Sequence, residues 1–209
     1  MTHGISHGFS SSRLARILPT LAAHYIDTGA IPGALLMIWR RGVLAHLDMA
    51  GHTDLERGRP VREDAIYRIY SMTKPVTSVA LLMLLEEGRI ALDDPVSRYI
   101  PGFAGLGVFA GASNGNFVTT PPARPMQVVD LLRHTSGLTY DFHYRTPVDA
   151  AYRRMGVGAL GTKDGLAAMV AQLERLPLEF SPGERWTYSV ATDVAGYLVE
   201  KISGMRFGD

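Results

Sequence analysis

A serine and a lysine three positions apart are the first residues whose types and spacing could do chemistry. The segment Ser71-Met72-Thr73-Lys74 directly precedes Pro75 and a strongly apolar run. Proline is tolerated best in a first helical turn, so a helix is expected to begin near Ser71, and positions three apart share a helix face. The Lys74 ammonium would then lie beside the Ser71 hydroxyl, with helix N-terminal N–H groups available to an oxyanion. Spacing alone also allows a plainer interpretation, a serine N-cap followed by a solvated lysine.

The remaining candidate motifs are weaker. The segment Gly111-Ala112-Ser113-Asn114-Gly115 matches the Gly-x-Ser-x-Gly elbow of α/β-hydrolases, but that motif needs a following helix and residues 116–122 cannot form one. Gly105-Leu106-Gly107 lacks the spacing of a dinucleotide fingerprint. The seven histidines show no His-Glu-x-x-His pattern and there is no cysteine. The sequence therefore predicts no metal site, no cofactor and no disulfide.

Composition narrows the class of partner. The 209 residues are 46% hydrophobic and carry a formal net charge of +1, which is typical of one globular domain. No basic run of the kind that binds nucleic acid or an anionic membrane is present, so a small neutral or weakly charged ligand is expected. Residues 1–12 contain no signal-like apolar stretch, and the longest apolar run, Val79 to Leu85, is far shorter than a membrane span. These features favour a cytoplasmic protein.

The elements that must position Ser71 follow from apolar periodicity and turn residues. An amphipathic helix is expected over about residues 12–29, with Pro19 kinking it or marking its true first turn. Two apolar runs around Arg41-Gly42 predict a β-hairpin. The expected elements are the helix 12–29, hairpin strands 33–39 and 43–50, a β-like stretch 66–70, a helix 75–87 buried on all sides, a helical turn 95–100, a long glycine-rich loop 102–122, helices 125–133, 147–155 and 164–176, and a last helix capped by Ser189 and closed by Gly204.

Three segments taken together resemble one family. Ile69-Tyr70-Ser71-Met72-Thr73-Lys74-Pro75-Val76-Thr77 resembles the first motif of class C β-lactamases and the related family VIII carboxylesterases. Leu131-Leu132-Arg133-His134-Thr135-Ser136-Gly137-Leu138 is similar to the segment that follows it. Phe180-Ser181-Pro182-Gly183-Glu184-Arg185-Trp186-Thr187-Tyr188-Ser189 is similar to the approach to the second motif. The resemblance runs from about residue 12 to the end, with the segments in the family's order.

The resemblance implies an α+β fold of the β-lactamase/transpeptidase type. An antiparallel sheet, here only its first strands, would be flanked by a helix and joined to a mostly helical subdomain. Residues 1–209 would form one C-terminally truncated domain, with the helix and strands in about 12–70 and the nucleophile helix and helical subdomain in about 71–209. The resemblance makes Ser71 the acylated nucleophile, Lys74 and Tyr188 its proton-transfer partners, and the Ser71 backbone N–H an oxyanion donor. Val190 and Trp186 would line the substrate site.

One departure from the family pattern bears on the substrate. The β-lactamase second motif is Tyr-x-Asn, whereas this chain has Tyr188-Ser189-Val190. Valine cannot hydrogen-bond the amide side chain of a β-lactam, and a simple ester has no such group, so ester hydrolysis through an acyl-enzyme is predicted. The alternatives are a penicillin-binding β-lactamase or D-alanyl-D-alanine carboxypeptidase, and a non-catalytic binding or scaffold member.

A second departure concerns residues beyond the chain. The family's third motif and second oxyanion donor would lie after Asp209. Residues 1–209 alone are therefore predicted to be inactive and to associate through an exposed sheet edge.

Overall fold

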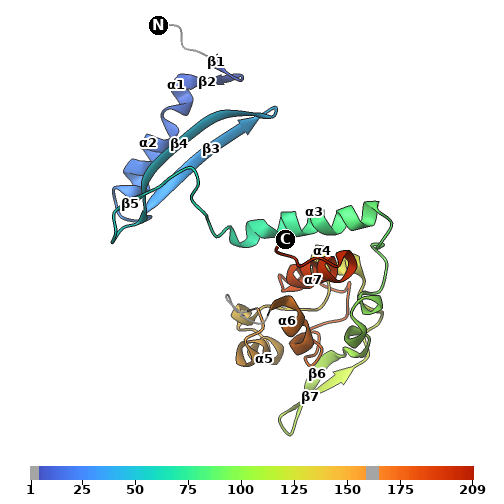
Figure 1. Ribbon diagram of the computed structural model, residues 1–209. Coiled ribbons are helices and arrows are strands. Elements are labelled where there is room, and N and C mark those ends of the chain that lie inside the picture. Colours follow the sequence, from blue (N-terminus) through green and yellow to red (C-terminus); the bar gives the residue numbers. More distant parts are fainter. Residues whose placement is uncertain (1–4, 159–164) are drawn as a thin grey trace. The chain divides into compact units, whose positions relative to one another are not determined.

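The computed structural model describes residues 5–158 and 165–209, and these divide into two compact units, Met1–Arg68 and Ile69–Asp209. We call them unit 1 and unit 2. Both helices and antiparallel strands are present, which confirms the predicted α+β class (Figure 1). The start of the helix predicted over 164–176 lies outside the described residues. Within the described ranges, no helix has the length and apolar character needed to span a bilayer.

Unit 1 is a small antiparallel sheet with helical segments packed on it. The predicted hairpin is confirmed as β3 and β4, and a short β5 adds a third strand that was not predicted. Gly33 and Gly51 face each other in this ladder, and a Cβ on Gly51 would lie 2.4 Å from the Pro32 carbonyl oxygen, so the strands can approach only with glycine there. The elements of unit 1 are β1 (Ile5–Ser6), β2 (Phe9–Ser10), α1 (Ser11–Leu14), α2 (Ile17–Leu21), the π-helix η1 (Ala22–Ile26), β3 (Gly33–Arg40), β4 (Val43–Asp54) and β5 (Arg59–Pro60).

The continuous helix predicted over residues 12–29 is instead three short segments. Proline has no N–H to donate to the carbonyl four residues earlier, and the helix is interrupted between α1 and α2. Pro19 then sits in the first turn of α2, where the missing N–H is not needed. The sequence thus located the true first turn but not the break before it.

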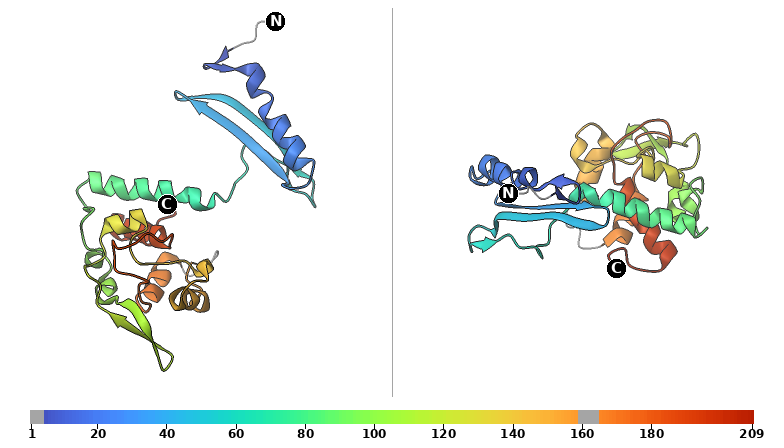
Figure 2. Two further views of the ribbon diagram at one scale, coloured as in Figure 1. Left: turned by 180° about the vertical axis from the view of Figure 1, so that it is seen from behind. Right: turned by 90° about the horizontal axis from the view of Figure 1, so that it is seen from above.

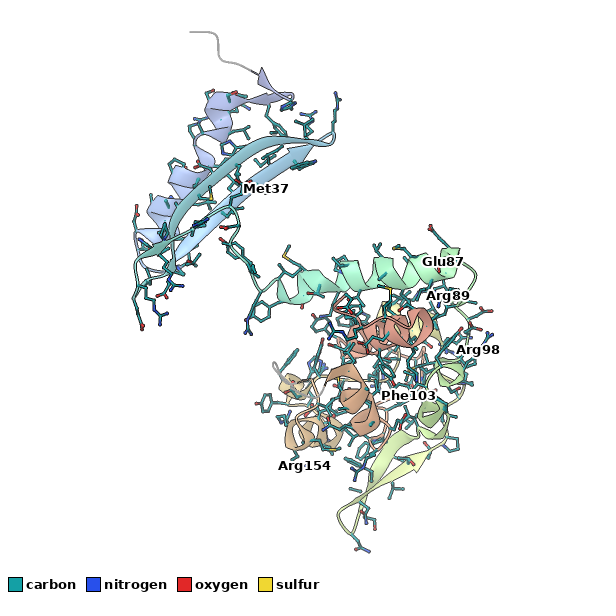
Figure 3. All side chains as sticks on the ribbon, in the orientation of Figure 1. Met37, Glu87, Arg89, Arg98, Phe103 and Arg154 are labelled. Atoms are coloured by element: carbon teal, nitrogen blue, oxygen red, sulfur yellow. The ribbon has the colours of Figure 1, made fainter. Side chains whose placement is uncertain are left out.

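Unit 2 is a helical assembly with a β-hairpin at one end (Figure 2). Helix α7 packs against α3, α4 and α6, and the largest apolar core lies among these helices and the turns beside them. Phe103 points into this core from the turn η4 (Figure 3). The elements of unit 2 are η2 (Tyr70–Met72), α3 (Thr73–Glu86), η3 (Val96–Arg98), η4 (Pro101–Gly105), β6 (Val108–Ser113), β7 (Asn116–Thr120), α4 (Val128–Arg133), η5 (Asp141–His143), α5 (Pro147–Met155), α6 (Gly165–Leu173) and α7 (Ala191–Ser203).

Within unit 2, the other elements cover one face of helix α3, and the prediction of burial on all sides stays a prediction. Thr77, Leu81 and Leu84 are buried and recur at helical spacing, whereas Val76 and Val79 are 63% and 58% exposed. The reason is geometric: α7 runs along one side of α3 and can cover only the stripe that faces it. Apolar residues all round a helix indicate a preference for burial but do not say which neighbours supply it.

Three smaller predictions, one at the junction of the units and two in unit 2, are also corrected. Residues 66–69 are not a strand, and the long loop predicted over 102–122 contains η4 and the β6–β7 hairpin. The hairpin turns at Asn114-Gly115, both with positive φ as a two-residue turn of this kind requires. Ser189 is not the N-cap of α7, because that position is Val190. The Ser189 Oγ accepts a long 3.4 Å bond from the Ala191 N–H and also lies 3.2 Å from the His134 Nδ1.

Candidate active site

Ser71 sits in a tight 3-10 turn at the entrance to α3. Its predecessor, Tyr70, has a φ of 46°, a left-handed conformation that is uncommon for a residue with a side chain and that is often found beside functional groups. Met72 donates its N–H to the Ile69 carbonyl and closes the turn. The Ser71 N–H lies in the first turn of this helical segment, where amide groups have no earlier carbonyl of the helix to bond.

Lys74 follows one turn later on the same face, as the spacing predicts. Its Nζ donates a hydrogen bond of 3.2 Å to the Ser71 Oγ. Pro75 is the third residue of α3, within the first turn, so it continues the helix without the loss of a needed donor. The plainer interpretation of a solvated lysine therefore does not describe this side chain.

Tyr188 reaches the same point from 117 residues away. Its hydroxyl oxygen lies 2.6 Å from the Ser71 Oγ, and either oxygen can be the donor. The loop before α7 is fixed by a 2.9 Å bond from the Thr187 N–H to the His134 carbonyl. The His143 Nε2 lies 2.6 Å from the Tyr188 carbonyl oxygen and donates to it. The structure thus brings together the three residues predicted to act as nucleophile and proton-transfer partners.

The proton affinity of Tyr188 reflects opposing effects. Burial raises the pKa of the phenol, while hydrogen bonds from Lys74 and Ser71 and the positive charge of Lys74 lower it, with a net pKa below the ordinary value near 10. The Asp193 carboxylate acts in the opposite direction to Lys74. The Lys74 Nζ lies 4.7 Å from the centre of the Tyr188 ring, so this cation is in direct contact with the tyrosine.

A cavity of about 610 Å³ opens beside Ser71. Ser71, Lys74 and Tyr188 form part of its wall. The rest includes aromatic and aliphatic side chains, among them Tyr70, Tyr140, Phe142, Leu166 and Phe207. A mostly apolar cavity with a few convergent polar groups is typical of a small-molecule site.

Two residues predicted to line the substrate site do not line this cavity. Val190 is completely buried, packed beside Gly158 in the core. Trp186 is exposed and stacks on the Tyr188 ring at 6.5 Å. An asparagine at position 190 would place its amide in this buried position, so the absence of that asparagine says less about substrate choice than the sequence suggested.

Several residues around the site were not singled out from the sequence. His134 contacts the Tyr188 ring at 5.1 Å between centroids, and burial, followed by the charge of Lys74, lowers its pKa. Tyr140 lies at the same distance between ring centroids, 5.1 Å, and burial raises the pKa of its phenol. Asp193 also lies in the cavity wall, but an acid three residues into a helix ordinarily indicates only a favourable N-terminal charge, so no sequence pattern singled it out. In the described part of the chain, no cluster of three or more histidine, aspartate or glutamate side chains could hold a metal ion.

Comparisons with known proteins identify the family and the fold. The Beta-lactamase family model matches residues 18–209. Protein Rv1367c of Mycobacterium tuberculosis is 40% identical over 176 residues, which are 84% of this chain and 43% of that protein. Esterase EstB of Burkholderia gladioli is 35% identical over 175 residues, or 82% of this chain and 41% of EstB.

Among solved structures, EstCE1, described as a hydrolase with promiscuous acyltransferase activity, superimposes with a TM-score of 0.78 at 29% identity. That alignment covers 94% of this chain and 49% of EstCE1. The fold is therefore of the β-lactamase/transpeptidase type. The chain spans less than half the length of each of these relatives.

Proposed function

The chain belongs to the Beta-lactamase family, and from that premise we propose that it carries the nucleophile and proton-transfer groups of a serine hydrolase that cleaves carboxylic esters through an acyl-enzyme. The observation that carries the proposal is the contact of the Ser71 Oγ with both the Tyr188 oxygen, at 2.6 Å, and the Lys74 Nζ, at 3.2 Å. A serine within hydrogen-bond reach of a base, itself contacted by a third group, is the arrangement of an activated nucleophile.

The proton transfers follow from the hydrogen bonds. With Tyr188 as phenolate, the Ser71 hydroxyl donates to it and the Lys74 ammonium donates to the Ser71 oxygen. The Ser71 Oγ then attacks the ester carbonyl while its proton moves to Tyr188, and the carbonyl oxygen takes the negative charge near the Ser71 N–H. When the intermediate collapses, the alcohol leaves with the proton from Tyr188 and the acyl group stays on Ser71. Water then attacks the acyl carbon as Tyr188 takes its proton, the bond to the Ser71 oxygen breaks, and Tyr188 returns the proton to Ser71 as the acid leaves.

The lowered pKa of Tyr188 supports the tyrosine as the base. A general base works best when its pKa lies near the operating pH, and a free phenol near 10 is too basic to be ionised at neutrality. Lys74 and Ser71 both favour the phenolate. Lys74 in its neutral form is the alternative base, and the geometry serves either assignment.

The cavity favours esters with apolar groups. Aromatic and aliphatic side chains, including Phe142, Leu166 and Phe207, make up much of its wall, and acyl or alkoxy carbon chains would be removed from water there. A short-chain aryl ester such as p-nitrophenyl butyrate is a suitable probe. The full-length protein is expected to hydrolyse it much faster than nitrocefin, and faster turnover of nitrocefin would favour a β-lactamase instead.

A second candidate is transfer of the acyl group to an alcohol rather than to water. The relative EstCE1 is described as a hydrolase with acyltransferase activity, and the first half of the reaction is the same. The two candidates separate at the second half. Adding an alcohol acceptor to the p-nitrophenyl butyrate assay and measuring new ester against free butyrate gives the partition. A third possibility, a non-catalytic member, predicts that a fluorophosphonate does not phosphonylate Ser71.

A further inference from the structure

The carbonyl group of Tyr188 is held by a side chain rather than by the backbone. The His143 Nε2 lies 2.6 Å from its oxygen, and within residues 5–158 and 165–209 no other donor bonds that oxygen. The neighbouring residues are held in another way: Thr187 and Val190 donate their N–H groups to backbone carbonyls of the loop before His143, at 2.9 and 3.2 Å. One imidazole therefore supplies the hydrogen bond that orients the peptide group after Tyr188.

The contact also shows which nitrogen of the imidazole carries a hydrogen. A carbonyl oxygen only accepts hydrogen bonds, so the Nε2 of His143 is protonated and donates. The imidazole packs beside two aromatic rings, with its centroid 5.2 Å from that of Phe142 and 6.4 Å from that of Tyr140. These contacts restrict rotation of the ring and keep its donor directed at the Tyr188 carbonyl.

The turn η5, which carries His143, is itself anchored to α5. Arg153 of that helix donates to the Asp141 carbonyl and lies over the Tyr144 ring, 4.0 Å from its centre. The same guanidinium pairs at 2.8 Å with the buried carboxylate of Asp149. A side chain holds a functional group accurately only when its own element is held, and η5 meets that condition.

The position of the Tyr188 oxygen matters at the scale of one hydrogen bond. It lies 2.6 Å from the Ser71 Oγ, and hydrogen bonds between hydroxyl oxygens span about 2.5–3.0 Å. A shift of about half an ångström away from Ser71 takes this contact to its limit, and catalytic groups need to be held to about that accuracy. Among the described residues, those that line the cavity do not include His143, so its route to the reaction is through Tyr188.

We propose that His143 is a positioning residue: its Nε2–H fixes the Tyr188 carbonyl and so keeps the phenol oxygen within hydrogen-bond reach of the Ser71 Oγ. The inference rests on the proposed function, in which these two oxygens exchange a proton. The backbone bonds at Thr187 and Val190 keep the segment in place without His143, so loss of the donor leaves a tyrosine that is present but less accurately placed. The effect belongs to kcat rather than to KM, because the transition state needs this alignment and substrate binding does not.

Substitutions in the full-length protein separate the donor from the ring. His143→Phe keeps an aromatic ring beside Phe142 and Tyr140 but has no N–H, whereas His143→Gln gives up the ring and keeps a side-chain N–H donor. We expect His143→Phe to lower kcat for p-nitrophenyl butyrate by about tenfold with KM nearly unchanged; a misplacement of about 1 Å costs about a hundredfold, and the flanking backbone bonds limit the shift. His143→Gln should recover most of the loss. His143→Met is a second variant without a donor and should behave as His143→Phe does.

Tyr144→Leu is the matched control. It disturbs the same turn by removing the ring beneath Arg153, but it leaves the His143 donor in place. It should therefore leave kcat unchanged. Circular dichroism shows whether each variant is folded.

Three results in folded variants would overturn the inference. They are full kcat in both variants without a donor, a loss in His143→Gln as large as that in His143→Phe, and an equal loss in Tyr144→Leu. The second would mean that ring packing matters and the third that any loosening of the turn has the same effect. Failure of the proposed function is a different result, the absence of both ester hydrolysis and fluorophosphonate labelling on Ser71 in the unmodified protein, and it would remove both proposals.

Discussion

The change Arg124→Met is expected to lower the free energy of unfolding of unit 2 by about 3 kcal/mol. The Arg124 guanidinium makes a two-pronged contact with the Asp130 carboxylate, at 2.7 and 2.8 Å. The Asp130 side chain is only 3% exposed, whereas that of Arg124 is 37% exposed. Removing one partner of a buried ion pair costs about 3–5 kcal/mol, and partial exposure of the guanidinium places the loss at the lower end. The carboxylate keeps its bonds from the Gln127 N–H and the Thr135 hydroxyl.

The effect should depend on pH with a definite sign. Burial raises the pKa of Asp130, but the bonds from Arg124, Gln127 and Thr135 outweigh it and hold the pKa below its usual value. A carboxyl with a lowered folded pKa contributes stability in full above its unfolded value, near 4, and loses it as the pH falls through the folded value. The difference in unfolding free energy between the two proteins should therefore shrink as the pH is lowered from 7 towards 3.

Tryptophan fluorescence can isolate the right unit. Trp39 lies in unit 1 and Trp186 in unit 2, so in a Trp39→Phe background urea unfolding of unit 2 is followed by one probe. The matched control is Arg98→Met, because Arg98 pairs with Asp94 at 2.8 Å while 64% exposed, and exposed pairs contribute about 0–1 kcal/mol (Figure 3). Equal losses in the two variants, or a loss at Arg124 that grows as the pH falls, would refute the reasoning.

Three other substitutions test the site and its support. Lys74→Ala and Tyr188→Phe should each lower kcat/KM for p-nitrophenyl butyrate by at least about a hundredfold. If the two residues act as one unit, the double variant should be little worse than either single variant. Losses that multiply in the double variant would mean that the two residues have independent roles. Gly183→Ala should destabilise unit 2 by about 1–2 kcal/mol or more in the same fluorescence assay, because Gly183 has a φ of 86° and an added Cβ would lie 2.2 Å from an Arg124 nitrogen. An unchanged unfolding midpoint would contradict this.

Local patterns in the sequence predicted local structure well. The β3–β4 hairpin and α5 were predicted because alternation, proline and turn residues act over a few positions. The β6–β7 hairpin was missed because its many glycines outweighed the Asn114-Gly115 turn signal, which is itself strong. The apolar residues all round α3 predicted burial but not that α7 is the helix that covers the Thr77, Leu81 and Leu84 face.

The spacing of residues in the sequence predicted only part of the candidate site. Ser71 and Lys74 are three residues apart and meet through helix geometry alone. Tyr188 meets them through a fold that joins positions 117 residues apart, so only a resemblance could point to it. Asp193 and Tyr140 carried no local signal, because they reach the cavity wall only through the fold.

Covalent labelling of the full-length protein tests the central claim most directly. A fluorophosphonate is incubated with the unmodified protein and with Ser71→Ala and Ser113→Ala, and the modified peptide is identified by mass spectrometry. The hydrogen bonds at the Ser71 Oγ predict one adduct, on Ser71, lost in Ser71→Ala and kept in Ser113→Ala, because Ser113 lies at a hairpin turn. An adduct on Ser113, or labelling that survives Ser71→Ala, would contradict the assignment of Ser71 as the nucleophile.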